Sequence, residues 1–342
     1  MDLSICIVSY ECREKLRACL ESIRANRPSV EHEVIVVDNG STDGAVTMLK
    51  EHFYWVRVLA NPENRGFSVA MNQAVQASTG KVILMLNPDT EVVGDALGAL
   101  LRFVRERPWI GAVGPKLVDP DGDPENSCRE FPTLMNALWD LTGLSRAFSG
   151  SRVFGHYLMS WWDHSEPRAV DWLSGAALMF TRMAWQKVGP LDEAFFLPAA
   201  DLDWQKRLQR AGLDRWYLPS AQILHHHGRS WGGDEADEIV PLHMAAFRYF
   251  AKHHGTLSAL ALRALTILTF GPKTLWAALR ALVRPSDDAR RNVRTASAVL
   301  RTALGFPPRS ALDGRDFAPR ADRARGDASS EPPTQATDSA SE

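Results

Sequence analysis

The stretch VILMLNPDT, residues 82–90, decides how the fold is interpreted. Its continuous apolar run is typical of a strand that is buried on both faces of a sheet. The run ends abruptly at Asn87, Pro88 and Asp89. The sequence therefore predicts a central strand with a carboxylate where the strand ends.

Strands and helices alternate on either side of this stretch through the first 120 residues. The predicted strands are 3–10, 33–38, 56–60 and 82–87, and the predicted helices are 14–25, 44–52, 68–78 and 94–107. Alternation with short links predicts an α/β fold, with a mostly parallel, Rossmann-like sheet and helices on both faces. Ligands of such sheets bind beyond the carboxyl ends of the strands. We expect the polar residues that follow three strands to converge there: Ser9, Tyr10, Asp38, Asn39, Asn87 and Asp89.

Composition narrows the class of protein. The 342 residues are 45% hydrophobic, and 39 Lys and Arg face 41 Asp and Glu, so no global basic field favours nucleic acid. The four cysteines form no C-x-x-C pair, which favours reduced, structural thiols. The N-terminus has no basic leader, and no apolar run reaches the length of a membrane span. We expect a cytoplasmic protein.

Two strand-end carboxylates are candidate ligand contacts. Asp38, in VVDNGSTDG, suits the ring N–H or hydroxyls of a nucleoside, although an Asx turn or a helix cap would equally explain it. Asp89 suits a hard divalent cation, since Mg²⁺ commonly takes one or two carboxylates together with phosphate oxygens. A cap on the next helix is the weaker explanation, because that helix is predicted to begin several residues later, near Gly94.

Further candidates lie in the second half of the chain. One of the histidines in HHHGRS, from His225, would complete a site begun by Asp89, but adjacent residues of a strand point to opposite faces. Asp201, in LPAADLDW, lies where a loop enters a helix, and is either a helix cap or a general base beside a substrate. Asp203 is a lesser candidate for the base, and it does not share a helical face with Asp201.

The order of several motifs resembles the family 2 glycosyltransferases of GT-A fold, most closely their bacterial rhamnosyltransferase-like branch. The resemblance covers roughly residues 3–232 and rests on these motifs: IVSY, VVDNGSTDG, NRGFSVAMNQA, LMLNPDT, DWLSGAALMF, VGPLDEAFF, DLDWQKRLQRAG and LHHHGRS. It implies inverting transfer of a sugar from a nucleotide diphosphate sugar to an acceptor hydroxyl. The resemblance implies that Asp201 is the catalytic base, that Asp89 holds Mg²⁺ or Mn²⁺, and that His225 contacts the same metal or the diphosphate.

The same resemblance assigns the other site residues. The nucleotide and donor side comprises Ser9, Tyr10, Asp38, Asn64, Arg65, Gly66, Asn72 and Asn87, the last in place of the first acid of a D-x-D motif. The acceptor or donor-sugar region comprises Trp172, Ser174 and Gly175. Two positions depart from the family. Ala200 stands where a Glu usually precedes the base, and Glu11 follows Tyr10 where Asn is usual, so a non-catalytic or degenerate sugar-nucleotide-binding protein is the alternative function.

The chain is expected to divide into three parts. Residues 1–235 form the catalytic domain, with a nucleotide-binding half over about 1–118 and an acceptor half over about 119–235. A helical region, 236–308, is followed by a disordered tail, 309–342, that is polar and aperiodic. Between Thr256 and Pro308 eight residues are basic and two acidic. A basic, apolar helical pair over 256–284 suits the surface of an anionic membrane, or packing on the catalytic domain or in a dimer.

The partners follow from the resemblance: a nucleotide diphosphate sugar and a saccharide or lipid-linked saccharide acceptor, in cell-surface polysaccharide or glycolipid synthesis at the inner face of the membrane. The branch resembled points to rhamnose as the sugar. A nucleotidyltransferase would need a Gly-rich phosphate loop, and a dinucleotide-dependent oxidoreductase a G-x-G-x-x-G after its first strand. The segment IVSYECREKL has no glycine, which excludes both.

Overall fold

A computed structural model describes residues 1–196, 198–226 and 235–307 of the chain. The elements predicted over the first 107 residues are confirmed, and β5 is an additional short strand. The first elements in chain order are β1 (Leu3–Ser9), α1 (Arg13–Ala25), β2 (His32–Asp38), α2 (Ala45–His52), β3 (Val56–Ala60), α3 (Phe67–Ala77), β4 (Val82–Leu86), β5 (Thr90–Val92) and α4 (Ala96–Arg105).

The middle of the chain supplies the rest of the sheet and the helices beside it. These elements are β6 (Ile110–Val118), β7 (Cys128–Arg129), α5 (Leu134–Thr142), α6 (Leu144–Ala147), β8 (Arg168–Ala169), β9 (Trp172–Leu173), β10 (Ala177–Thr181), α7 (Arg182–Val188), α8 (Ala200–Arg210) and β11 (Asp214–His225). The main sheet has the order β3-β2-β1-β4-β10-β6-β11-β5, with β8 paired to β11. β3, β2, β1 and β4 run parallel, while β10 runs antiparallel to both its neighbours. The predicted mostly parallel sheet is confirmed.

Alternate residues of the central strands pack on opposite faces of the sheet. Ile5 and Ile7 of β1 join one hydrophobic cluster with α1, α2 and α4, whereas Cys6 and Val8 join another with α3 and α8. Ile5, Cys6 and Ile7 have no exposed surface, as expected for a strand covered by helices on both sides. Burial of these side chains, worth about 1.5–3 kcal/mol each, fixes the register that aligns the strand ends.

Three expectations for the middle of the chain are corrected. The stretch 170–180 is not one strand but two, β9 and β10, because Gly175 lies in a turn packed against Asp201. The short strand predicted at 215–219 is the start of the 12-residue β11, which pairs with β6 across a register shift after Leu218. The region 119–169, given no firm elements, contains α5, whose cap Thr133 accepts a hydrogen bond from the Asn136 N–H.

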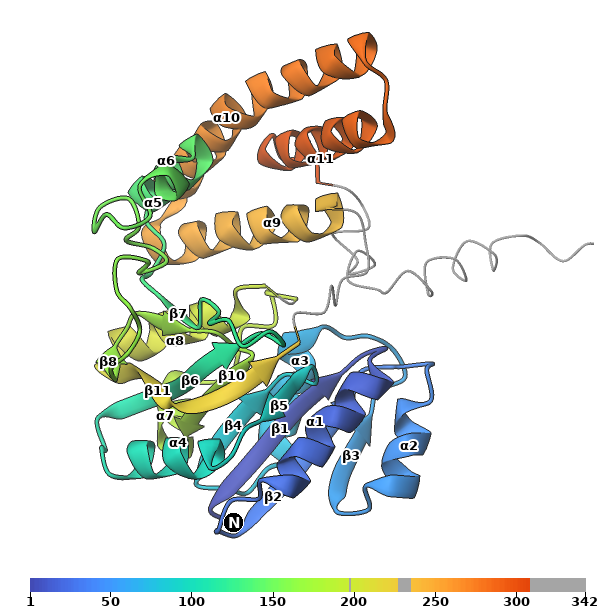
Figure 1. The fold of residues 1–342 in the computed structure, drawn as a ribbon, viewed down its shortest axis with the longest axis vertical. Coiled ribbons are helices and arrows are strands. Elements are labelled where there is room, and N and C mark those ends of the chain that lie inside the picture. The colour runs from blue at the N-terminus through green and yellow to red at the C-terminus, as the bar shows by residue number, and fades with distance from the viewer. Residues whose placement is uncertain (197, 227–234, 308–342) are drawn as a thin grey trace, which may run out of the picture.

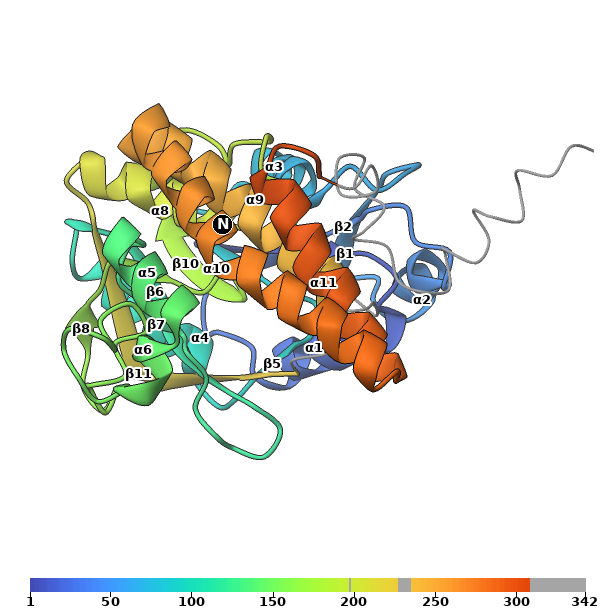
Figure 2. The same ribbon diagram turned by 90° about the horizontal axis from the view of Figure 1, so that it is seen from above.

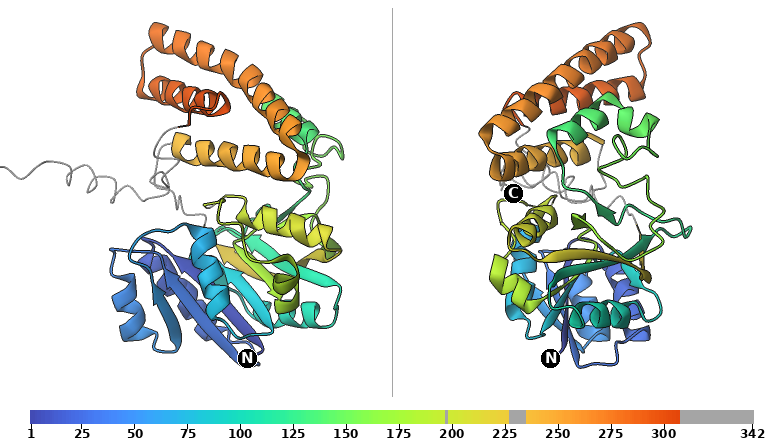
Figure 3. Two further views of the ribbon diagram at one scale, coloured as in Figure 1. Left: turned by 180° about the vertical axis from the view of Figure 1, so that it is seen from behind. Right: turned by 90° about the vertical axis from the view of Figure 1, so that its left-hand side faces the viewer.

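Three C-terminal helices form a layer beyond the carboxyl ends of β1 and β4 (Figure 1, Figure 3). They are α9 (Glu235–His254), α10 (Thr256–Val283) and α11 (Asp287–Ala303), and they contact one another. Two expectations are wrong. Leu242 is 55% exposed rather than core-facing, and α10 continues through Gly271-Pro272 instead of breaking. Pro272 is exposed, so the carbonyl left without its helical bond one turn earlier faces solvent.

The helical layer is attached to the sheet domain through α9. His253 and Lys252 both bind the buried carboxylate of Asp203 on α8, each at 2.7 Å. Seen from above in Figure 2, α10 and α11 lie over α9. Within the described ranges no helix has the length and apolarity needed to span a bilayer. The tail predicted to be disordered, 309–342, lies outside the described residues.

Candidate functional site

Strand register brings the first two strand ends together. Ser9 and Asp38 are paired at the ends of β1 and β2. Asp38 is 1% exposed, and its Oδ1 accepts a hydrogen bond from the Ser41 N–H at 3.0 Å. Its Oδ2 is buried and finds no hydrogen-bond partner among the described residues. Leaving a buried acceptor unsatisfied costs about 1–3 kcal/mol, so this oxygen is suited to a donor group of a ligand.

The predicted residues at 64–66 form a loop braced against Asn39, beside Asp38. The Asn39 amide donates to Asn64 Oδ1 at 2.8 Å, and its oxygen accepts from the Arg65 N–H at 3.2 Å. Gly66 adopts φ +84°, and a Cβ there would lie 2.7 Å from the Phe196 ring. Glycine is therefore required for this close approach. The Arg65 side chain is exposed, whereas Asn64 Oδ1 accepts a hydrogen bond from the Gly66 N–H within the loop.

Asn72 has a structural role that the sequence did not indicate. Its amide donates to Leu191 O at 3.0 Å and to Glu193 Oε1 at 3.0 Å, and its oxygen accepts from the Leu191 N–H at 2.9 Å. The residue thus fastens α3 to the loop that leads into α8. A contact between Asn72 and the nucleotide, implied by the family resemblance, stays a prediction.

Asp89 and His225 are brought together because β11 pairs with β5. That pairing places His225 opposite Thr90, next to Asp89. His225 Nε2 lies 3.5 Å from Asp89 Oδ1, and Lys15 Nζ lies 3.9 Å from Asp89 Oδ2. The predicted neighbourhood of the two residues is present in the structure.

Glu125, which the sequence analysis missed, is the third charged group at this position. Its Oε2 lies 2.9 Å from His225 Nδ1. Burial by itself disfavours the charged imidazole, but the hydrogen bonds to Asp89 and Glu125 raise the pKa of His225 to about 9. The two carboxylates therefore favour the protonated ring. Glu125 comes from the aperiodic loop after β6, where no sequence pattern marks it.

The donors present suit a divalent cation. Among the described residues no group of three His, Cys, Asp or Glu is arranged to hold a metal. Asp89 Oδ1 and His225 Nε2 nevertheless face each other and would supply two ligands once a cation has displaced the proton on Nε2, and ions such as Mg²⁺ are commonly held by one or two protein ligands plus phosphate oxygens and water. Asn87 contributes its backbone to this edge: its N–H donates to Ala176 O at 2.8 Å, which ties β4 to the turn before β10.

Asp201 lies at the start of α8, and its side chain packs against the turn between β9 and β10. Its Oδ2 accepts a hydrogen bond from the Gly175 N–H at 2.8 Å, and a Cβ at Gly175 would lie 2.9 Å from that oxygen. Burial raises the pKa of Asp201, while hydrogen bonds and the Arg129 charge partly offset the effect. Ala199, just before the helix, has φ +68°, which costs a non-glycine residue about 1 kcal/mol.

Asp203 is occupied elsewhere. Its side chain has no exposed surface and binds Arg207, Lys252 and His253. Burial opposes its charge, but these hydrogen bonds and charges lower the pKa of Asp203. The sequence-based expectation that the two carboxylates point apart is confirmed. Ala200, between the loop and Asp201, is fully buried.

The predicted acceptor region surrounds an arginine that the sequence analysis did not select. Trp172 Nε1 donates to Glu130 O at 3.1 Å, and Ser174 Oγ accepts from the Ala176 N–H at 3.3 Å. The Arg129 guanidinium lies 4.9 Å from the centre of the Trp172 ring, and its buried Nε has no hydrogen-bond partner among the described residues. This cation lies over an aromatic face, and its charge acts on the Asp201 carboxylate, an arrangement that suits a polar or anionic ligand.

Comparison with known proteins gives a consistent result. Residues 4–156 match the family model described as Glycosyl transferase family 2. The chain is 30% identical over 274 residues to the N-acetylglucosaminyl-diphospho-decaprenol L-rhamnosyltransferase of Mycobacterium tuberculosis (strain ATCC 25618 / H37Rv), covering 74% of this chain and 85% of that protein. It is 22% identical over 260 residues to Rhamnosyltransferase WbbL of Escherichia coli (strain K12), covering 72% and 92%.

A solved structure supports the fold. Mannosyltransferase PcManGT from Pyrobaculum calidifontis, determined in complex with GDP-Man and Mn²⁺, superposes with a TM-score of 0.50 at 17% identity, covering 91% of this chain and 86% of that one. The predicted GT-A-type fold is thereby confirmed.

Proposed function

Because the chain belongs to glycosyl transferase family 2, and is thus a glycosyltransferase, we propose that it transfers a sugar from a nucleotide diphosphate sugar to an acceptor hydroxyl with inversion. Asp201 is the base in this proposal, and Asp89 with His225 forms the cation site. Rhamnose is the proposed sugar, since the two relatives described above are named rhamnosyltransferases.

The observation that carries the proposal is the short chain of contacts between the two acids. Asn87, two residues before Asp89, donates its N–H to Ala176 O at 2.8 Å. Gly175, which comes directly before Ala176, donates its N–H to Asp201 Oδ2 at 2.8 Å. The segment that carries Asp89 and the side chain of Asp201 are therefore both hydrogen-bonded to the turn before β10, at the carboxyl end of β4, where ligands of parallel sheets bind.

The donor nucleotide is proposed to lie over β1 and β2. The unsatisfied Asp38 Oδ2 would accept a hydrogen bond from the nucleoside, beside Ser9 and Tyr10. The loop braced by Asn39 would border the same ligand. Bound divalent cation would neutralise the charge that develops on the diphosphate as it leaves.

The acceptor hydroxyl is proposed to attack from the side of Asp201. Its oxygen forms a bond to the anomeric carbon as the bond to the diphosphate breaks, and its proton passes to the Asp201 carboxylate. A pKa raised by burial makes this carboxylate a stronger base than a solvent-exposed aspartate. The stacked Trp172 and Arg129 would orient the substrate beside it.

The acceptor is proposed to be lipid-linked, as the name of the M. tuberculosis relative indicates for that protein. Helix α10 supports this, because large apolar side chains on its outward side are exposed. We call them the apolar ridge: Leu257, Leu260, Leu268, Leu275, Leu279 and Leu282, with exposures of 83%, 55%, 72%, 64%, 49% and 80%. Such a ridge among basic residues fits the surface of an anionic membrane, at the inner face of which we place the enzyme.

Thermal stabilisation by nucleoside diphosphates tests the donor site. One diphosphate is expected to raise the unfolding temperature more in Mn²⁺ than in its absence, because ligands that bind the native state stabilise it. Asp89→Ala is expected to remove the Mn²⁺-dependent part, whereas Asp121→Asn, an exposed change, retains it. Equal stabilisation of both variants would contradict the assignment. Transfer assays with the same donor then separate an enzyme from a non-catalytic binder, which would show no turnover.

A further inference from the structure

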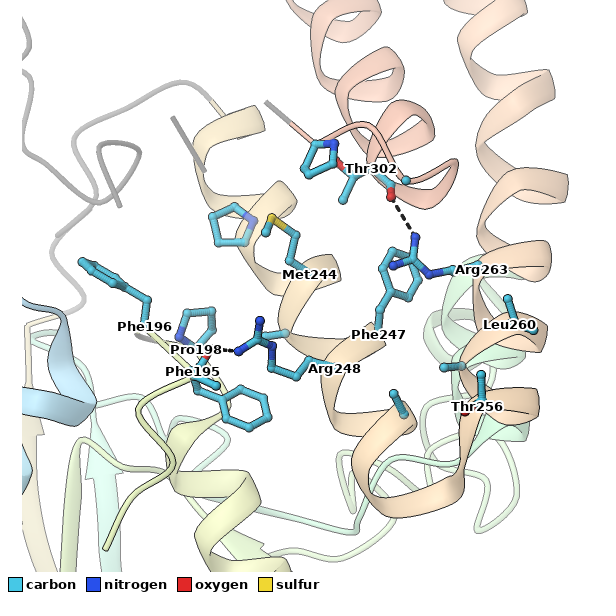
Figure 4. A pocket seen from close by; sticks show the side chains of 17 residues that line it. Phe195, Phe196, Pro198, Met244, Phe247, Arg248, Thr256, Leu260, Arg263 and Thr302 are labelled. Atoms are coloured by element: carbon cyan, nitrogen blue, oxygen red, sulfur yellow. Dashed lines mark hydrogen bonds between the residues drawn. The ribbon is translucent and has the colours of Figure 1, made fainter. Parts of the chain in front are cut away.

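A groove of about 640 Å³ lies between the sheet domain and the helical layer. One wall is the loop before α8, with Phe195, Phe196 and Pro198, and the other comes from α9, α10 and the end of α11 (Figure 4). The helical lining residues are Pro241, Met244, Ala245, Phe247, Arg248, Ala251, Thr256, Ala259, Leu260, Arg263 and Thr302. The volume is that of a small-molecule site, for which about 300–1,000 Å³ is usual.

The lining is apolar with two fixed cations. Arg248 donates to Ala194 O and lies over the Phe195 ring, while Arg263 donates to Thr302 O at 3.1 Å and lies 4.5 Å from the Phe247 ring centre. None of the described lining residues is acidic. The groove therefore suits a hydrocarbon chain that carries an anionic group.

The groove shares a wall with the proposed active site. The Phe196 carbonyl accepts a hydrogen bond from the Phe67 N–H at 2.7 Å, and the Phe196 ring packs on Gly66. A few residues later the same loop enters α8, whose second residue is Asp201. A ligand in the groove is thus anchored beside the segment that positions the base.

The groove is also continuous with the apolar ridge. Leu260 belongs to both: it lines the groove and is 55% exposed on α10. From there the ridge extends along α10 to Leu282, in a segment where basic residues outnumber acidic ones. The apolar ridge therefore continues into the groove, and the groove leads to the loop before Asp201.

We propose that this groove holds the hydrocarbon chain of the acceptor lipid next to its phosphate, with Arg248 and Arg263 facing the anionic group. The proposal rests on the proposed function, in that it assumes a lipid-linked acceptor. The helical layer would then contribute to the choice of acceptor. The part of the hydrocarbon chain nearest the phosphate binds in the groove, and the rest of the hydrocarbon chain lies along the apolar ridge in the membrane.

Direct binding of prenyl phosphates tests the groove without relying on turnover. Calorimetry on the full-length protein with geranyl, farnesyl and geranylgeranyl phosphate is expected to show affinity rising about tenfold or more along the series, because each added prenyl unit buries more apolar surface. Inorganic phosphate is the probe for the anionic group alone. Equal affinity for all four probes, or no binding by any of them, would overturn the proposal.

A matched pair of variants locates the site. Ala251 lines the groove and is exposed, so Ala251→Trp is expected to fold while obstructing the groove and removing the dependence on chain length. Ala25 at the end of α1 is exposed and does not line the groove, so Ala25→Trp is expected to bind as the unaltered protein does. Equal binding by the two variants would contradict the location.

The outcomes separate this inference from the proposed function. Binding that depends on chain length, without transfer of any sugar, would sustain the groove and remove the proposed reaction. Transfer to short-chain and long-chain acceptors at equal rates, without prenyl phosphate binding, would sustain the reaction and remove the groove.

Discussion

The sheet edge and the helical layer bear opposite kinds of unfavourable groups. At the sheet edge charged groups are buried: Asp38, Asp89 and His225 are each less than a tenth exposed. In the helical layer apolar groups are exposed along α10. Both arrangements cost stability, the first by desolvating charge and the second by hydrating hydrocarbon. One region therefore offers polar contacts to a ligand, and the other offers apolar contacts.

The largest loss of stability is expected at Asp203, which joins the sheet domain to the helical layer. Asp203→Ala would leave Lys252, His253 and Arg207 without their shared carboxylate. Removing one partner of a buried ion pair commonly costs about 3–5 kcal/mol, so the free energy of unfolding should fall by that order. Urea unfolding measures it. A loss below about 1 kcal/mol would show that this contact does not hold the layers together.

Glu125 provides the next test, at the polar edge. Glu125→Gln should weaken Mn²⁺ binding in the presence of a nucleoside diphosphate by about 10–100-fold, because carboxylates that orient a ligating histidine have effects of that size. Asp121→Asn, on the same loop and exposed, is the control. Calorimetric titration gives both affinities, and unchanged affinity in Glu125→Gln would remove Glu125 from the cation site.

The apolar ridge gives a smaller effect. Leu275→Glu is expected to reduce sedimentation with phosphatidylglycerol vesicles about tenfold, through lost apolar burial and added negative charge. Asn292→Glu adds the same charge on an exposed position of α11 and should have little effect. If both variants bind vesicles equally, charge alone attracts the protein and the ridge is not the contact.

The last test is a pH dependence of stability that arises at Glu130, between β7 and α5. Burial and the neighbouring Asp171 raise the pKa of Glu130 to about 7 from an ordinary 4.5. Between those values the folded state binds more protons than the unfolded state, so stability falls as pH rises from 4.5 to 7. Glu130→Gln should flatten this slope. Urea titrations at several pH values across the window measure it, and an unchanged slope would assign it to other groups.

Sequence reasoning succeeded where one local pattern fixes one element. The alternation through the first 107 residues predicted β1 to α4, and the strand-end rule found Asp38 and Asp89. It failed where distant contacts decide. Gly175 divides a predicted strand because it packs on Asp201, and Pro272 is tolerated because α10 faces solvent there. Glu125 and Arg129 were missed because no periodic pattern marks the loop after β6 or the two-residue strand β7, and only long-range contacts bring them to the site.

The rate of sugar transfer by Asp201→Asn shows whether Asp201 is the catalytic base. The uncharged amide cannot take the proton of the acceptor hydroxyl, so the rate is expected to fall by about 10²–10⁴-fold. Donor binding should persist. Burial raises the pKa of Asp201, so at pH values above the ordinary aspartate pKa the charged side chain makes the folded state less stable. The uncharged Asn should therefore leave the protein no less stable at neutral pH.

The pH profile belongs to the same measurement. With Asp201 as the base, transfer should decline as the pH falls through a value above the ordinary aspartate pKa of 3.8, since protonation removes the base. Near-complete loss of transfer in Asp201→Asn, with donor affinity intact, is the expected result. Transfer at the unaltered rate by that variant would contradict it.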